Sequence, residues 1–230
     1  MIIAQKLRKE NIAEYLLYMW QVEDIIRAYN CSLTQLKSEY IARFQVDDIE
    51  IYEEMVDWYG NIIRMMNQEG KREKGHLNIN DIIVQDLGDL SAQLLASTKF
   101  PFYNAEYYRV LPYIVELRNK GDKDVSEIET CLNALYGVMM LRLQNKEVSQ
   151  QTQNAVKEIT TFLGMLADYY KKDKEEGLEF LWVDINEALK KMKECLGKLK
   201  ESKYDDIYRT KFMVMRDIKI LEYYLKNKKN

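Results

Sequence analysis

Glycine and proline are scarce in this chain, which has 9 glycines and 2 prolines among 230 residues. β-Sandwiches and β-barrels need many turns, and turns use both residues, so the scarcity argues against these folds. Leucine, isoleucine, methionine, glutamate and lysine, which favour helices, are abundant instead. The composition predicts an all-α protein: a multi-helix bundle of six or seven helices followed by a C-terminal helical hairpin.

Long apolar runs are also missing. No stretch approaches the roughly 20 apolar residues of a membrane-spanning helix, and charges begin at Lys6, where a signal peptide needs an apolar core. Cys31, Cys131 and Cys195 are odd in number and widely separated, so they form neither a disulfide framework nor a metal-ligand spacing. We therefore expect a soluble, cytoplasmic protein with reduced thiols and no membrane partner.

His76 is the single histidine of the chain. A single histidine excludes metal sites that need two histidines. No nucleophile-elbow or phosphate-binding glycine motif is present either. Glu73 and His76 have the spacing of half a di-iron motif, but that site needs a second such pair and two further carboxylates. Gly75 favours a loop, so we interpret His76 as a turn or helix-start residue. We predict no catalytic residue, no metal and no cofactor, and an atypical enzyme remains an open alternative.

The charge is unevenly distributed along the chain. Residues 177–230 contain 13 basic and 9 acidic side chains, whereas the whole chain has a net charge of −3. The acidic remainder argues against a broad nucleic-acid surface, so we do not expect nucleic-acid binding except through the basic tail.

Apolar residues repeat at helical spacing along most of the chain. The first predicted helix runs from about Ala4 to Tyr29 and is apolar almost all round its middle, so it should be buried on several sides. Capping residues predict further helix starts at Ser32, Asp47, Asn78 or Asn80, Asn104, Asp124 and Ser149.

Two proline segments should interrupt the pattern. Phe100, Phe102 and Tyr103 surround Pro101 and should clamp a break in the helices onto the body. An interior proline costs a helix about 3 kcal/mol, so Pro112 predicts either a kink or a new helix that begins there.

The sequence predicts two parts: a helical bundle domain over residues 1–177 and a helical hairpin over residues 178–230. The hairpin would use two narrow apolar seams, as coiled coils do. The seams are Ile185, Leu189, Met192, Leu196 and Leu199, then Ile207, Val214, Ile218, Leu221 and Leu225. The hairpin could pack on its own body or on a partner.

Glu23, Asp24 and Arg27 bring charge into the apolar first helix. Glu23 and Arg27 are four residues apart in the favourable order, so an intrahelical ion pair explains them simply. The alternative is a buried carboxylate at an inter-helix pocket, which Trp58, His76, Tyr113 and Glu116 would help to line.

Several segments resemble a family of uncharacterised helical domain-of-unknown-function proteins from Bacteroidetes bacteria. The resemblance covers about residues 2–180 and rests on segments 10–24, 74–77, 99–103, 111–118, 129–131, 134–137 and 169–174. The family has no assigned activity, so the resemblance implies no catalytic residues.

The function that these patterns favour is a non-enzymatic interaction or scaffolding role, through a homodimer or a helical protein partner. The narrow seams and the 17 tyrosines, whose amphipathic rings suit interfaces, favour it. A small-ligand binder or atypical enzyme with a pocket near Glu23 is the alternative. Nucleic-acid contact through the basic hairpin is a third.

Overall fold

The protein is all-α, as the composition predicts. A computed structural model describes residues 1–121, 125–178, 190 and 193, and these contain no strand. Residues 1–178 contain eight α-helices and one 3₁₀ helix, more than the six or seven predicted. The helices are α1 (Ile2–Glu10), α2 (Ile12–Ala28), α3 (Leu33–Glu39), η1 (Ile41–Arg43), α4 (Ile49–Gln68), α5 (Asn78–Ala96), α6 (Pro101–Lys120), α7 (Glu127–Leu143) and α8 (Gln150–Glu176).

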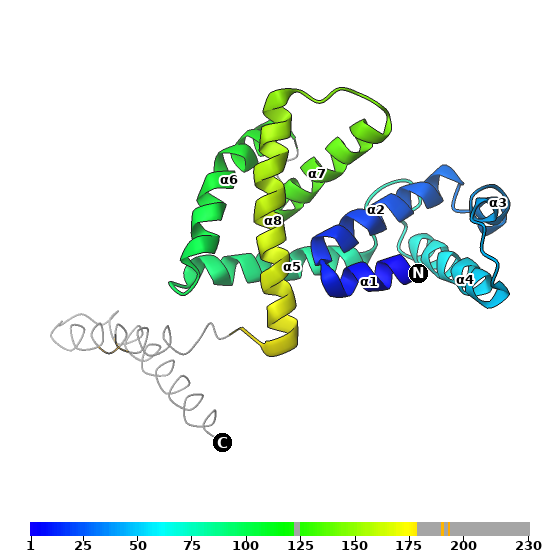
Figure 1. Cartoon of the computed structure of the whole chain (residues 1–230), viewed down its shortest axis with the longest axis horizontal. Helices are drawn as coiled ribbons and strands as arrows, with labels where there is room; N and C mark the ends of the chain where they lie inside the picture. The colour runs from blue at the N-terminus through cyan, green and yellow to red at the C-terminus, as the bar shows by residue number, and fades with distance from the viewer. Residues whose placement is uncertain (122–124, 179–189, 191–192, 194–230) are drawn as a thin grey trace, which may run out of the picture. The chain divides into compact units, whose positions relative to one another are not determined.

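The predicted single first helix is wrong, because the chain breaks at Asn11. Asn11 has an extended backbone (φ −151°), and its side-chain oxygen accepts hydrogen bonds from the backbone N–H groups of Ala13 and Glu14. That arrangement is an N-cap, which satisfies the free donors at the start of α2. The break folds α1 back against α2 (Figure 1).

The core lies where α8 and α2 meet the other helices. α8 contacts α2, α5, α6 and α7, and Figure 1 shows it (yellow) running across them. Phe162 and Leu166 of α8 and Leu16, Trp20 and Ile26 of α2 are at most 1% exposed. Burying side chains of this size contributes roughly 1.5–3 kcal/mol each, so this contact zone dominates the stability of the bundle.

The capping signals predicted most helix starts to within a residue or two. Ser32 and Ser149 cap α3 and α8, which confirms both predictions. Asp48 rather than Asp47 caps α4. Ser126 caps α7, and Asp124 lies outside the described residues.

The start of α5 contradicts the prediction that Asn78 or Asn80 caps it. Leu77 is the N-cap residue and supplies no side-chain cap. Two carboxylates from elsewhere in the chain replace it: Glu69, at the end of α4, accepts the Asn78 N–H at 2.7 Å, and Glu23 accepts the Leu77 N–H at 3.1 Å. The helix therefore begins where tertiary contacts satisfy its donors.

α6 contradicts the helix start predicted at Asn104 and one of the two alternatives predicted at Pro112. It runs from Pro101 to Lys120 without interruption, so no new helix begins at either residue, and the alternative of a kink at Pro112 stays a prediction. Pro101 occupies the first helical position, where the backbone N–H that proline lacks would have no partner within the helix. Of the predicted clamp, Tyr103 is fully buried and Phe100 packs edge-on to Tyr169, but Phe102 is 77% exposed.

The chain divides into two units, Met1–Leu178 and Glu179–Asn230. Both predicted hairpin seams lie outside the residues that can be described in detail. Within the described residues, no helix has the length and apolar character that crossing a membrane requires.

Candidate functional site

The carboxylate of Glu23 is completely buried in the bundle. Its Oε1 accepts hydrogen bonds from the backbone N–H of Leu77 at 3.1 Å and the side-chain amide of Asn80 at 2.8 Å. Its Oε2 lies 2.8 Å from Nδ1 of His76. A carboxylate inside a protein is tolerated only when several donors replace the water it loses, and these three donors do so.

The donors come from a segment more than fifty residues away in sequence. Residues 71–76 form a loop, and the first turn of α5 follows it directly. Glu23 sits on the buried side of α2, opposite this first turn, where the helix dipole is positive. The carboxylate therefore fixes the start of α5 against the middle of α2.

Arg27 supports the same loop from outside. Its guanidinium donates to Asp24 at 2.7 Å, to the Lys71 carbonyl at 3.3 Å and to the Gly75 carbonyl. Its distance to Glu23 is 3.9 Å, so the predicted intrahelical pair is the longer of the two ion pairs that Arg27 makes. Glu23 has its short contacts with His76, Leu77 and Asn80 instead.

The ring of His76 is held on two sides. Its Nδ1 faces Glu23, and the ring stacks on Trp20 with a centroid distance of 4.1 Å and an interplanar angle of 13°. Because the carboxylate can only accept, Nδ1 carries a proton, and in the neutral ring Nε2 is left to act as an acceptor. No hydrogen bond joins Nε2 to any of the described residues, and the side chain is 24% exposed.

Tyr136 of α7 closes the outer side of the network. Its hydroxyl donates to Asp24 at 2.6 Å, and its ring packs edge-on to Trp20 at 5.8 Å. Burial, and then the hydrogen bond to Asp24, raise the pKa of the Tyr136 phenol above its usual value. The phenol therefore stays a donor at physiological pH.

A cleft of about 600 Å³ opens beside His76. It lies between α5, the loop before it and the start of α7. Its walls include Trp20, Lys71, Gly75, His76, Asp81, Val84, Gln85, Gly88, Asp89, Ser126 and Glu129. Gly88 leaves open space, since a Cβ atom placed there would meet nothing within 4 Å.

Two buried polar atoms of this region have no hydrogen-bond partner among the described residues: the indole nitrogen of Trp20 and Oδ1 of Asn80. Orphaned buried groups are rare and need an explanation such as a water or a ligand. Both carboxylate oxygens of Glu23 therefore have hydrogen-bond partners, whereas these atoms of Trp20 and Asn80 have none among the described residues.

The structure brings together four of the seven residues singled out in the sequence: Glu23, Asp24, Arg27 and His76. The other three lie apart from the cleft. Trp58 lines a separate, smaller hollow and packs on Tyr59. Glu116 pairs with Lys120 at 2.6 Å, and Tyr113 lies half-buried on the same helix.

Sequence reasoning missed Trp20, Asn80 and Tyr136 as members of the network. Trp20 looked like ordinary core, and Asn80 like a helix cap. Tyr136 had no signal that set it apart from the other tyrosines, because a hydrogen bond over 112 residues leaves no trace in local spacing.

The cleft has no cluster of metal-ligating side chains within the described residues. Among the described residues, no group of three or more histidine, cysteine, aspartate or glutamate side chains could hold an ion. Its chemistry is that of hydrogen bonds and charges from His76, Lys71 and the carboxylates around them.

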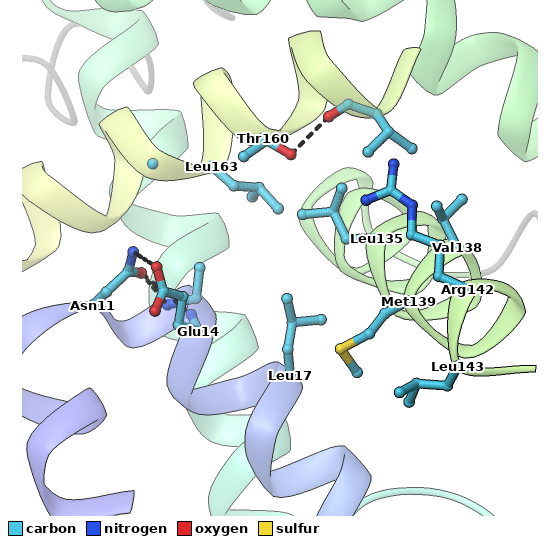
Figure 2. A pocket seen from close by; sticks show the side chains of 13 residues that line it. Asn11, Glu14, Leu17, Leu135, Val138, Met139, Arg142, Leu143, Thr160 and Leu163 are labelled. Carbon is cyan, nitrogen blue, oxygen red and sulfur yellow. Dashed lines mark hydrogen bonds between the residues drawn. The ribbon is translucent and has the colours of Figure 1, made fainter. Parts of the chain in front are cut away.

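A second hollow is apolar. This groove of about 450 Å³ lies between α2, α7 and α8 (Figure 2). Leu17, Leu135, Met139 and Leu163 supply its apolar walls in Figure 2, while Asn11, Glu14 and Arg142 mark its polar edge. Leu143 beside it is 61% exposed.

No curated protein and no solved structure matches the chain. A family model does: the domain of unknown function DUF4924 matches residues 1–177, which is the whole of the helical bundle from α1 to α8. This match agrees with the resemblance seen in the sequence. The chain therefore belongs to the DUF4924 family.

Proposed function

We propose that the protein binds a small molecule in the cleft beside His76. One observation carries the proposal: Glu23 and Trp20 hold the His76 ring rigidly at the edge of the cleft, while its second nitrogen has no hydrogen-bond partner among the described residues. Binding sites typically combine a concave surface with a few polar groups fixed from behind.

The cost of the arrangement supports a functional role. A buried ionised group loses several kcal/mol of hydration, and an apolar residue of similar size would often stabilise the fold as well or better. A carboxylate placed behind a histidine, as in many proteins that use the imidazole, instead sets which ring nitrogen carries the proton. We propose that Glu23 is the positioning residue and His76 the contact residue.

The test is a thermal-shift screen of a metabolite library against the wild-type protein and two variants. Gly88→Leu fills the cleft and Gly164→Leu fills the apolar groove, and at both positions a Cβ atom meets nothing within 4 Å. We expect ligands that raise the melting temperature of wild-type protein and Gly164→Leu but not of Gly88→Leu. Ligands that act equally on all three, or a library with no ligand, contradict the proposal.

A second candidate function is that of an interaction protein, and the apolar groove favours it. We propose that the groove takes part in association with a second copy of the chain. Residues 1–176 carry a net negative charge and residues 177–230 a net positive charge, and this complementarity favours association between copies. Light scattering of the full chain tests this. A dimer that Gly164→Leu converts to monomer supports it, and a monomeric wild-type protein contradicts it.

We also propose a cytoplasmic location. Cys31 and Cys131 are buried free thiols, as expected of a protein in a reducing compartment. Fractionation of cells that produce the native protein, followed by immunoblotting, checks this.

A further inference from the structure

We infer that the ligand of the cleft is a small organic cation, such as a primary ammonium group with a short apolar part. This inference rests on the proposed function, since it names the chemical class that the same cleft takes. It follows from the charges on the cleft walls, the state of His76 and the apolar part of the lining.

The walls carry more negative than positive charge. Asp81, Asp89 and Glu129 line the cleft, and Lys71 is the lysine among them. Lys71 lies 3.4 Å from Asp81, so its charge is largely offset. Asp89 makes no hydrogen bond or ion pair with the other described residues, and its side chain is exposed at the cleft. A cation placed there would gain an ion pair that the protein alone does not provide.

His76 also favours a ligand that donates a hydrogen bond. Because Glu23 accepts from Nδ1, Nε2 of the neutral ring offers a lone pair to the ligand. An ammonium group can donate to Nε2 or pair with Asp89, whereas a carboxylate or phosphate ligand would face Asp89 with like charge.

Part of the cleft lining is apolar. Val84 and the bare backbone of Gly88 also line the cleft, and the buried indole N–H of Trp20 has no acceptor within the described residues. This second observation points to a ligand that also has a short apolar part and an acceptor atom. Tyramine is such a molecule.

The experiment compares three probes of similar shape: tyramine, a cation; tyrosol, which is neutral; and 4-hydroxyphenylacetate, an anion. Binding to the full-length protein is measured by calorimetry, and its place by the imidazole ¹⁵N signals of His76. Since the chain has one histidine, these signals are unambiguous in protein purified without a histidine tag.

We expect tyramine to bind and shift the Nε2 signal, tyrosol to bind at least 3-fold more weakly, and the anion not to bind. Asp89→Asn should weaken tyramine binding about 3- to 10-fold. Asp86→Asn is the matched control: Asp86 lies on the same helix but pairs with Lys174 and does not line the cleft, so affinity should stay unchanged.

Two kinds of failure can be told apart. If tyramine does not bind, or if tyrosol or the anion binds as tightly, or if Asp89→Asn leaves affinity unchanged, the cation inference is overturned. The proposed function still stands in those cases when library ligands stabilise wild-type protein but not Gly88→Leu. If no molecule shifts His76 and the library has no ligand, both are overturned.

Discussion

At the scale of single residues, Glu23 is the decisive position, because three short hydrogen bonds end on its carboxylate. Glu23→Gln keeps the shape but presents an amide N–H₂ to groups that are themselves donors. We expect unfolding by urea to show a loss of about 2–4 kcal/mol. Glu10→Gln, at an exposed ion pair with Lys6, is the control and should change stability by less than about 1 kcal/mol. Equal effects of the two variants would contradict the described role of Glu23.

Cys131 is the second residue with a measurable consequence. Burial, and then the charge of Glu127, raise the pKa of its thiol from 9.0 to about 12. The unfolded thiol ionises first as the pH rises, so the unfolded state binds fewer protons than the folded state between about pH 9 and pH 12. The stability that this thiol contributes is therefore fully present below about pH 9 and is lost as the pH rises towards 12.

The measurement is the free energy of unfolding against pH for wild-type protein and Cys131→Ala. Stability of the wild-type protein should fall between about pH 9 and pH 12, and Tyr107, whose pKa burial and Glu127 raise to about 12, should add to the fall. The variant is less stable at pH 7 because it leaves a cavity, but its decline should be shallower. Parallel curves for the two proteins would mean that the thiol is not protected as described.

At the scale of helices, Asn11 divides what the hydrophobic pattern predicts as one helix. Asn11→Ala removes the side-chain oxygen that caps α2 and should cost about 1 kcal/mol of stability. Asn11→Asp retains a capping oxygen and is the matched control, expected to unfold at nearly the wild-type urea concentration. An alanine variant as stable as wild type would show that packing of α1 alone enforces the break.

At Gly88, in contrast, we expect a substitution that does not lower the stability of the protein. It lies inside α5, where glycine costs roughly 0.5–1 kcal/mol relative to a good helix former, and nothing opposes an added side chain. Gly88→Leu should therefore be at least as stable as wild type while it closes the cleft. A marked fall in its melting temperature would mean that the cleft is not open.

The same helices show what the sequence could and could not predict. The helix starts at Ser32 and Ser149 were predictable because a cap acts within three residues. The start of α5 was not, because Glu23 and Glu69 satisfy its donors from elsewhere in the chain. At Pro112 the sequence left a kink or a new helix open, and the helix continues because packing of its buried face outweighs a local propensity.

At the scale of the whole molecule, composition and apolar periodicity were enough for the all-α class. The candidate site was predictable only in part. A carboxylate in an apolar stretch marked Glu23, and the count of histidines marked His76. The contact between Glu23 and His76 depends on how α2, α5 and α7 pack, which spacing within one helix does not encode. The same holds for the positions of Trp20, Asn80 and Tyr136 in the network.

The account depends on one claim about the assembled molecule: that Glu23 fixes His76 with its free nitrogen at a cleft that takes a ligand. The most direct measurement is the imidazole ¹⁵N spectrum of this single histidine at pH 8, with and without a ligand found in the library screen. We predict a proton on Nδ1 in wild-type protein, and a ligand-induced change at Nε2 that Gly164→Leu retains and Gly88→Leu abolishes. A proton on Nε2, or a ligand that leaves the imidazole signals unchanged in wild-type protein, would contradict the account.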